Sequence, residues 1–278
     1  MKKTVLLLTT LALLLQSGCA LIKKKDASHA VAAAEVSSAE ASADDRPDDG
    51  AFVAAVGRAL EARWDAAAAY TETELAALTV GQYQEYLSRC VEAERAEAGH
   101  LWDFNFHDKD LIAAAQTYYH GLELQREGAD YARTESLSEY NRTWVLGYYY
   151  RVSAVYDLYE LFGLDVGEQY RPALREFIAP YHTAKKQVAF QEFADTLPGT
   201  LRFEPDGDGC YSALIENTTE YTIFSMSVDV SFYDAAGVIV YQTSAWVSNL
   251  RPGEIIRSTV TVDAEGVVSD TCSVTIYQ

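Results

Sequence analysis

The spacing of apolar residues in this chain changes once, at Leu197-Pro198-Gly199, from a repeat of about 3.6 residues to a repeat of two. Before this point apolar residues recur three or four positions apart, a spacing that gathers them on one face of a helix. After it they alternate with polar residues, as on a half-buried strand. The sequence therefore predicts an α+β protein, in which a helical domain is followed by a separate domain of antiparallel strands.

Apolar stripes predict helices throughout residues 51–196. The first stripe consists of Phe52, Val56, Leu60, Trp64 and Ala67. Thr79 is expected to cap a second helix, and a third is expected to begin at Asp108 or Lys109 and to end near Gly128. Short connections between such segments favour antiparallel neighbours, so we expect an antiparallel helical bundle.

Two further helices are expected before the change of period. One runs from about Ser138 to Phe162 and has a wide apolar face, which predicts a central position in the bundle. The other begins near Tyr170 and extends to Phe193. Pro180 lies inside it and is expected to kink it, because proline lacks the amide hydrogen that an inner helical residue donates.

Residues 199–278 are predicted to form the domain of strands. The most regular strand has one apolar face, made of Phe224, Met226, Val228, Val230 and Phe232. Turns at 234–237 and 250–253 separate it from its neighbours. Other strands are expected near Thr200 and at 210–216, 238–246, 255–262 and 272–277. Six or seven short antiparallel strands over roughly 80 residues favour an immunoglobulin-like β-sandwich.

Three short segments of this domain carry a family resemblance. They are Val230-Ser231-Phe232-Tyr233-Asp234 with the later Gly237, the run Asn249-Leu250-Arg251-Pro252-Gly253-Glu254, and the earlier Glu216-Asn217-Thr218. The pattern resembles the FxLYD domain, a small β-sandwich common in exported bacterial lipoproteins. Val230 stands where the family name has Phe and Phe232 where it has Leu, and both keep an apolar side chain facing inward. The resemblance implies a place in the cell envelope and a binding or scaffolding role, and it carries no catalytic residue.

Residues 1–18 have the arrangement of a bacterial signal peptide. Lys2 and Lys3 precede an apolar run that is shorter than the roughly 20 residues needed to span a membrane. The segment ends in Gln16-Ser17-Gly18-Cys19, which resembles a lipobox, with Gln16 in place of the usual leucine-type residue. In a lipobox the cysteine thiol receives diacylglycerol, and the chain is cut just before it. We therefore expect acyl chains on Cys19 to anchor the protein to the extracytoplasmic side of the cell membrane; the alternative is an ordinary secretory signal.

Residues 19–50 are predicted to form a flexible acidic tether. From Asp26 to Gly50 the segment is rich in Ala, Ser, Asp and Glu and shows no apolar periodicity, so it cannot bury enough surface to fold. The run Lys23-Lys24-Lys25 directly after the anchor either attracts anionic headgroups or forms a solvated collar.

The formal net charge of −19 argues against a nucleic-acid partner. Phosphate binding depends on clustered Lys and Arg side chains, and acidic residues outnumber basic ones in this chain by 41 to 22. Such acidity is typical of a solubility device in a surface protein. The expected partners are the membrane, through the lipid anchor, and another component of the envelope.

Three cysteines remain once Cys19 is assigned to the lipid. Cys210 and Cys272 fall on the first long strand and the last strand of the predicted sandwich, and export would permit a disulfide between them. Free thiols are the alternative. Cys90 lies on an apolar helical face, which favours a buried, unreactive thiol.

The densest aromatic stretch lies in the fourth predicted helix, where Trp144 is followed by Tyr148, Tyr149 and Tyr150. Three adjacent helical positions span about 200°, so one or two of these tyrosines must lie off the core stripe. An exposed aromatic face could bind a glycan or a peptide. The alternative is packing between helices, with the hydroxyls at the edge.

No pattern in the chain identifies a metal, cofactor or catalytic site. His100, Asp103, His107, Asp108 and Asp110 form the densest cluster of potential ligands, and their spacing matches no common metal motif. Asp206-Gly207-Asp208-Gly209 lacks the glutamate that an EF-hand loop requires at its twelfth position, where Asn217 stands. We therefore assign no cofactor, no metal ligand and no catalytic residue.

Three functions remain open. The first is a non-catalytic envelope lipoprotein that binds or scaffolds another component, and the second is a lipoprotein that binds a peptide or a glycan. The third is a hydrolase with an unrecognised site in the helical half. A fold prediction does not decide between them.

Overall fold

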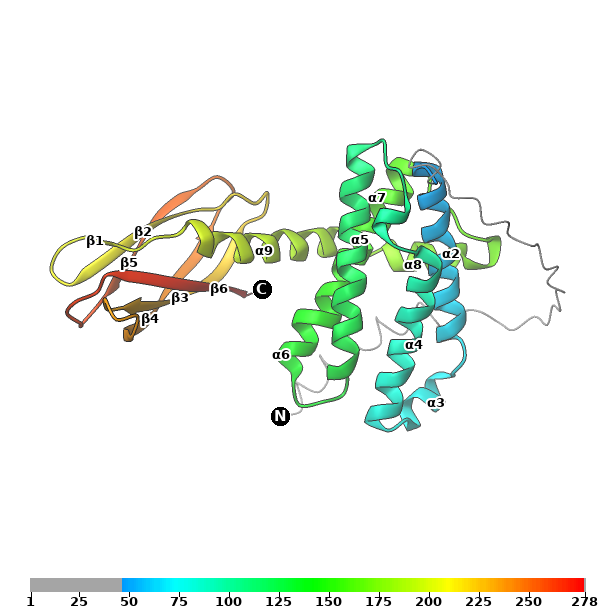
Figure 1. The fold of residues 1–278 in the computed structure, drawn as a ribbon, viewed down its shortest axis with the longest axis horizontal. Coiled ribbons are helices and arrows are strands. Elements are labelled where there is room, and N and C mark those ends of the chain that lie inside the picture. The colour runs from blue at the N-terminus through cyan, green and yellow to red at the C-terminus, as the bar shows by residue number, and fades with distance from the viewer. Residues whose placement is uncertain (1–46, 278) are drawn as a thin grey trace. The chain divides into compact units, whose positions relative to one another are not determined.

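A computed structural model describes residues 47–277 and shows a mixed α+β fold, with helices first and two small antiparallel sheets after them (Figure 1). The predicted signal peptide, Cys19 and most of the predicted tether lie outside the described residues. The chain divides into two compact units, and the division falls between Lys185 and Lys186. We call them the helical unit and the β unit and describe each by itself.

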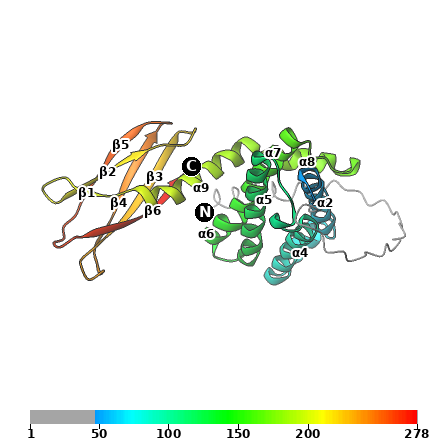
Figure 2. The ribbon, with the colours of Figure 1, turned by 45° about the horizontal axis from the view of Figure 1, so that its top comes forward.

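The helical unit contains a series of α-helices joined by short turns. They are α2 (Asp49–Ala67), α3 (Glu72–Ala77), α4 (Val80–Ala98), α5 (Lys109–Gly128), α6 (Leu137–Tyr140), α7 (Leu146–Phe162) and α8 (Arg171–Ile178), and α9 (Tyr181–Thr200) crosses the division. Helix α2 packs against α4, and α5 packs against α7, which lies beside it in Figures 1 and 2. Short 3₁₀ turns at Leu101–Asp103, Ala129–Tyr131 and Glu168–Tyr170 complete the connections.

Polar side chains begin several of these helices where the sequence predicts. Thr79 caps α4 in a reciprocal arrangement with Gln82, and the Asp108 carboxylate accepts hydrogen bonds from the first amides of α5. Asp48 caps α2 by accepting from the amide of Ala51. Helix α2 therefore starts at Asp49, inside the segment predicted as tether, because Asp48 satisfies one of its free amides and the negative charge of Asp49 in the first turn favours a helix start.

The long helical segment around residues 138–162 is confirmed, with one irregularity. Helix α6 continues through a π-helical turn at Asn141–Val145 into α7, and Gly163 ends it with a left-handed φ of 69°. The predicted kinked helix at 170–193 is instead two helices, α8 and α9. Pro180 separates them, since it cannot donate to the preceding turn, and its carbonyl accepts the first hydrogen bond of α9 from Ala184 at 2.9 Å.

The apolar stripes predicted for the helical unit form its core. All five residues of the first stripe are buried, and four of them, Phe52, Val56, Leu60 and Trp64, share one cluster with Leu111, Tyr118, Val155, Leu158 and Leu174 of α5, α7 and α8. A second cluster holds Leu87, Cys90 and Val91 of α4 together with Trp144.

The β unit contains two three-stranded antiparallel sheets (Figure 2). One has the order β1-β2-β5, with β1 at Glu204–Pro205, β2 at Cys210–Glu216 and β5 at Ile255–Thr261. The other has the order β4-β3-β6, with β3 at Ile223–Tyr233, β4 at Ile239–Leu250 and β6 at Ser269–Tyr277.

One apolar cluster joins the two sheets and the end of α9. It contains Ile215 of β2, Val260 of β5, Val228 and Phe232 of β3, and Phe193 of α9. The chain remains helical up to Thr200, and the strand predicted near that residue lies four residues later, as the two-residue β1. Leu197 and Leu201, one turn apart, are both buried in this cluster, which explains why the helix outlasts the change of period.

The alternation predicted for β3 is confirmed from Met226 onward and wrong at Phe224. Met226, Val228, Val230 and Phe232 are buried, whereas 58% of the Phe224 surface is exposed and Ile223 is buried in its place. The register with β4 is unchanged across this position, because Ile223 pairs with Leu250 and Ser225 with Ser248. Asn249, which lies across from Phe224 between these two pairs, has a left-handed φ of 55°, and this local distortion of the backbone accompanies the exposure of Phe224.

Candidate functional site

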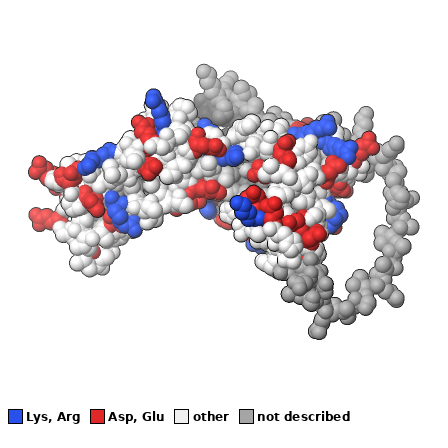
Figure 3. Space-filling view, turned by 90° about the horizontal axis from the view of Figure 1, so that it is seen from above, with Lys and Arg blue, Asp and Glu red and all other residues white. Residues whose placement is uncertain are grey.

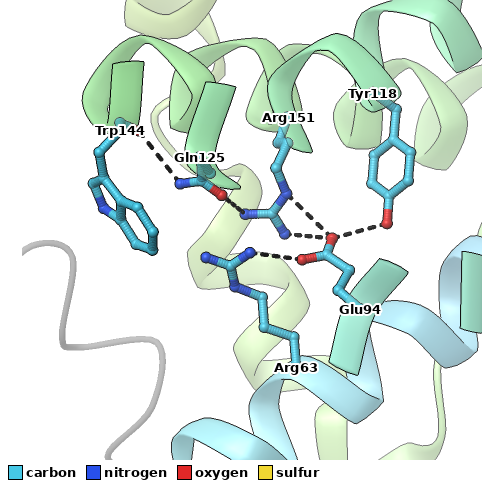
Figure 4. A network of polar contacts seen from close by, with 6 residues as sticks. All are labelled: Arg63, Glu94, Tyr118, Gln125, Trp144 and Arg151. Carbon is cyan, nitrogen blue, oxygen red and sulfur yellow. Dashed lines mark hydrogen bonds and ion pairs between the residues drawn. The ribbon is translucent and has the colours of Figure 1, made fainter. Parts of the chain in front are cut away.

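A buried ion network centred on Glu94 joins four helices of the helical unit (Figure 4). Oε1 of Glu94 accepts hydrogen bonds from the Tyr118 hydroxyl at 2.8 Å and from Nε and Nη2 of Arg151 at 3.1 and 2.6 Å. Oε2 accepts from Nη1 of Arg63 at 2.8 Å. The four residues come from α4, α5, α7 and α2 in turn, so the network ties these helices together.

Gln125 extends the network toward the π-helical turn. Nη1 of Arg151 donates to Oε1 of Gln125 at 2.8 Å, and Nε2 of Gln125 donates to the carbonyl of Trp144 at 3.4 Å. Two glycines make room for these side chains. A Cβ added to Gly121 would lie 2.7 Å from the carbonyl oxygen of Gly147 and 2.8 Å from Cγ of Arg151. Only glycine permits α5 and α7 to approach this closely.

The charges of the network stabilise one another. Burial alone would raise the pKa of Glu94, but Arg151 and Arg63 outweigh it and hold the pKa below its usual value of 4.5. Burial lowers the pKa of Arg151, with Arg63 acting in the same direction and Glu94 opposing it. Burial and the neighbouring Glu94 carboxylate raise the pKa of Tyr118.

This arrangement is suited to structure rather than to chemistry. Both oxygens of the ionised Glu94 carboxylate already accept hydrogen bonds from protein donors, so the carboxylate is neither a proton donor nor an open ligand. The guanidinium of Arg63 lies 5.6 Å from the centre of the Trp144 ring, and that of Arg151 lies 5.0 Å from the centre of the Phe177 ring. A substrate could reach Glu94 only by breaking these contacts.

The residues of the possible aromatic face, Trp144, Tyr148, Tyr149 and Tyr150, differ in exposure. Trp144 and Tyr150 are buried, and Tyr148 and Tyr149 are half-buried. Three of the rings contact aromatic rings outside the set: Trp144 stacks on Tyr140, Tyr148 contacts Phe177 edge-on, and Tyr150 contacts His120 edge-on. Tyr149 contacts Tyr148. Adjacent helical positions are about 100° apart, so neighbours in sequence point to different surroundings. Packing between helices therefore accounts for Trp144 and Tyr150, whereas Tyr148 and Tyr149 are packed on one side and exposed on the other.

In the His and Asp cluster at 100–110, backbone amides donate hydrogen bonds to aspartate carboxylates. The Asp103 carboxylate accepts a hydrogen bond from the amide of His100, and Asp49 accepts from the amides of His107 and Asp108. Within residues 47–277, no group of three or more His, Cys, Asp or Glu side chains is placed to hold a metal ion. In the same range, no helix is long and apolar enough to cross a membrane.

Cys210 and Cys272 do not form the predicted disulfide. Cys210 lies on β2 opposite Thr261, whereas Cys272 lies on β6 of the other sheet, opposite Val230. Both thiols are free, and so is the buried thiol of Cys90. Burial raises the pKa of Cys90, which favours the unreactive thiol form predicted for it.

The β unit presents a surface that the sequence predicts only in part. We call it the hydroxyl face: the side of the sheet β4-β3-β6 that points away from the apolar cluster. By strand register it comprises Ser225, Ser227, Asp229, Ser231 and Tyr233 of β3, Ile239, Gln242, Ser244, Trp246 and Ser248 of β4, and Ser269, Thr271, Ser273, Thr275 and Tyr277 of β6. Eleven of these fifteen side chains carry a hydroxyl group, and one carries a charge.

Two aromatic rings lie together near one end of the hydroxyl face. Trp246 and Tyr277 stack on each other with ring centres 5.5 Å apart and planes 21° apart. They come from the two outer strands: Trp246 lies opposite Ser227 of the central strand, and the Tyr277 hydroxyl is 3.4 Å from the hydroxyl of the same serine. Ser227 is buried. The Trp246 side chain is still 65% exposed and that of Tyr277 45% exposed. The face therefore presents exposed aromatic rings beside a row of serine and threonine hydroxyls.

Hydrogen bonds between neighbouring strands order the polar part of the face. Gln242 donates to the Ser231 hydroxyl at 3.0 Å, and the hydroxyls of Tyr233 and Thr271 are 3.1 Å apart. Ser244 donates to Asp229, the single charged group. Such cross-strand bonds fix the side chains in place on a rigid sheet.

Comparison with known proteins adds no relative: no family model, no curated protein and no solved structure matches this chain.

Proposed function

We propose that the protein is a non-catalytic binding protein, anchored by a lipid on Cys19 to the extracytoplasmic side of the cell membrane. The observation that carries the proposal is the sequence Ser17-Gly18-Cys19 at the end of a short apolar run that follows Lys2 and Lys3. Two or more acyl chains on one cysteine suffice for stable anchoring, since each buried methylene contributes about 0.8 kcal/mol.

Binding rather than catalysis is supported by the two polar constellations of the described residues. Around Glu94 every carboxylate oxygen is occupied by a protein donor, and the site is closed. The hydroxyl face is open, rigid and nearly uncharged, and serine and threonine hydroxyls with no adjacent base are poor nucleophiles. The surface drawn in Figure 3 has Lys and Arg dispersed among Asp and Glu, without the basic cluster that a nucleic-acid partner would require.

We further propose that the β unit is an immunoglobulin-like sandwich of the FxLYD type and that the helical unit is an antiparallel bundle. The support for the sandwich is the apolar cluster shared by two antiparallel sheets, together with the residues of the family resemblance. Within that pattern Asn217 is fully buried. Its Nδ2 donates to the carbonyls of Tyr221 and Leu250 at 2.8 and 2.9 Å, and its backbone pairs with Gly253 and Glu254. Binding would then be the role of the family-like domain, with the tether holding it off the membrane.

The anchor is tested by intact mass and membrane partitioning of the protein expressed in a bacterial host. Wild type should gain a diacylglycerol-sized mass and enter the membrane fraction, whereas Cys19→Ser should gain no lipid mass and remain soluble. Cys210→Ser is the matched control, because it removes a cysteine outside the lipobox and should leave both properties unchanged. A wild-type protein that is soluble and cut at another position would refute the anchor.

A further inference from the structure

We propose that the hydroxyl face binds an uncharged polysaccharide, with a pyranose ring packed on Trp246 and Tyr277 and the following sugar units hydrogen-bonded along the strands. This inference deepens the proposed function and rests on it for location, since a protein anchored outside the membrane meets the polymers of the envelope. The binding chemistry itself follows from the face.

The charge of the face selects for a neutral ligand. The chain as a whole is 23% charged, with a net charge of −19, yet Asp229 is the one charged group among the fifteen residues of the face, and Ser244 already donates to it. An anionic polymer would find no cation here and would be repelled by the rest of the chain. A cationic partner would find better sites elsewhere on the molecule.

The composition of the face is unlike that of a protein interface. The buried centres of protein interfaces are depleted in serine and enriched in aromatic residues, methionine and arginine. Here seven of the fifteen residues are serine, and the apolar part is confined to Ile239 and the ring pair. Burying the hydroxyls against a second copy of this sheet would cost free energy, because most of them would lose water without gaining a matched partner. Sugars carry hydroxyls that both donate and accept, and so can match them.

The ring pair supplies the apolar contact that sugar recognition requires. One side of a pyranose ring presents C–H groups, which pack on the electron-rich face of an aromatic ring. Trp246 offers most of its surface, and its stacking on Tyr277 fixes the orientation of both rings. The exposed rings therefore cost little conformational entropy when a sugar binds.

The dimensions of the face suit an extended polymer rather than a small molecule. Nine residues of β6 extend about 30 Å at 3.3 Å per residue, and three strands at 4.8 Å spacing are about 10 Å wide. Thr275 and Ser273 lie next to Tyr277 on the same side of β6, toward its N-terminal end. Their hydroxyls are exposed and make no side-chain hydrogen bond within residues 47–277. They lie where the next units of a chain leaving the ring pair would pass.

Retention on insoluble chitin, a neutral polymer of N-acetylglucosamine, tests the proposal. The full chain carrying Cys19→Ser is used, so that lipid cannot cause retention, and cellulose and polygalacturonate serve as a second neutral and an anionic polymer. We expect retention on at least one neutral polymer and none on polygalacturonate. Trp246→Ala should weaken binding at least about tenfold, as removal of a central aromatic contact usually does. Trp246→Phe should keep binding within about threefold, because a flat ring remains.

Two further variants distinguish binding at the hydroxyl face from non-specific adsorption and from loss of folding. Trp102→Ala removes a tryptophan of similar exposure, 70%, from the helical unit and should leave retention unchanged. Thr275→Val keeps the shape and the strand propensity of the side chain and removes one hydroxyl, so we expect binding to weaken severalfold while the circular dichroism spectrum stays the same.

Several outcomes would overturn the proposal while leaving the lipid anchor intact. They are no retention on either neutral polymer, equal loss with Trp102→Ala and Trp246→Ala, and dimers in sedimentation that Trp246→Ala dissociates, which would assign the face to a second copy. A failed lipidation test with intact retention would instead remove the proposed location and keep the binding site.

Discussion

Arg151 donates two hydrogen bonds to a single oxygen of Glu94, from Nε at 3.1 Å and from Nη2 at 2.6 Å, and both side chains are essentially fully buried. Burying two charges costs several kcal/mol, and their attraction offsets this only when the geometry is good and the remaining donors and acceptors are satisfied. The remaining groups of Glu94 are paired with Tyr118 and Arg63, and the remaining donor of Arg151 is paired with Gln125. The helical unit therefore depends on the whole set rather than on the pair alone.

Glu94→Ala should lower the free energy of unfolding by about 3–5 kcal/mol, because it leaves two guanidinium groups facing each other with no carboxylate between them. Urea unfolding followed by far-ultraviolet circular dichroism at pH 7 measures the change. Glu97→Ala is the matched control on the same helix. Its ion pair with Arg58 is long, 3.8 Å, and exposed, so a loss below about 1 kcal/mol is expected. Equal losses in the two variants would contradict the assigned role of the network.

Acid should destabilise wild type more steeply than Glu94→Gln. Burial opposes ionisation of Glu94, but the two arginines outweigh it and lower its pKa in the folded protein. Because the pKa of Glu94 is lower in the folded protein than in the unfolded chain, where it is near 4.5, the ionised carboxylate stabilises the fold at a pH above 4.5. This stabilisation is lost as the pH falls from 4.5 through the lower pKa of the folded protein. Unfolding midpoints measured between pH 7 and pH 3 test this. Parallel acid slopes in the two proteins would show that Glu94 is not ionised in the fold.

The sequence predicted the helix positions well because their signals are local. Thr79 and Asp108 cap their helices, and Gly163 ends α7, each through a contact made within a few residues. The first apolar stripe also predicted which face of α2 is buried. These features depend on one helical period and need no knowledge of the partner helix.

The ion network was missed although a signal was present. Glu94 follows Cys90 by four residues and Val91 by three, so it lies on the buried face of α4, and Arg151 lies four residues before the buried Val155. A charged residue in register with an apolar stripe predicts a buried partner of opposite charge. Which residue that partner is depends on how α4 and α7 pack, which the sequence does not state.

The hydroxyl face could be predicted only in part. The alternation predicted for β3 implies that residues between its apolar positions, such as Ser227 and Ser231, share the opposite side, and β3 does pair with β4, the strand that follows it. The contact between Trp246 and Tyr277 depends on the register of two strands on opposite sides of β3. Nothing near either residue in the sequence specifies that register, since it is set by pairing over the whole sheet.

Gly121→Ala should destabilise the helical unit by about 1–3 kcal/mol, the usual cost of overpacking. The added methyl would lie 2.7 Å from a carbonyl oxygen of α7, and backbone cannot yield as a side chain can. Gly81→Ala in α4 is the control, because its Cβ would meet nothing within 4 Å. For Gly81→Ala we expect the free energy of unfolding to rise by about 0.4–1 kcal/mol, because alanine reduces the conformational entropy of the unfolded chain. Thermal unfolding of both variants decides, and a tolerated Gly121→Ala would contradict the close approach of α5 and α7.

Reducing agent should not change the melting temperature of the protein. Cys90, Cys210 and Cys272 are free thiols in the structure, so no covalent bond is available for dithiothreitol to break. Thiol labelling of the denatured, non-reduced protein should modify all three. In the native state Cys90 should react slowest, since it is buried and burial raises its pKa. A mass increase of two hydrogens on reduction would instead show that Cys210 and Cys272 are bonded.

Asn217→Ala should lower the stability of the β unit by at least about 2 kcal/mol. The Asn217 side chain is fully buried, donates to the carbonyls of Tyr221 and Leu250, and accepts from the amide and the hydroxyl of Thr219. Alanine would leave these groups without a partner in a region closed to water, and each unsatisfied buried group costs about 1–3 kcal/mol.

Hydrogen–deuterium exchange of peptides covering residues 210–262 measures this loss where it arises. Faster exchange is expected at the turn that follows Leu250, whose backbone pairs with that of Asn217, and little change is expected in α2 or α5 of the other unit. Asn249→Gly is the control, because Asn249 has a left-handed φ of 55° that glycine adopts without strain. If Asn217→Ala left hydrogen exchange unchanged both in the loop after β2 and in the turn between β4 and β5, Asn217 would not be needed to join these two segments.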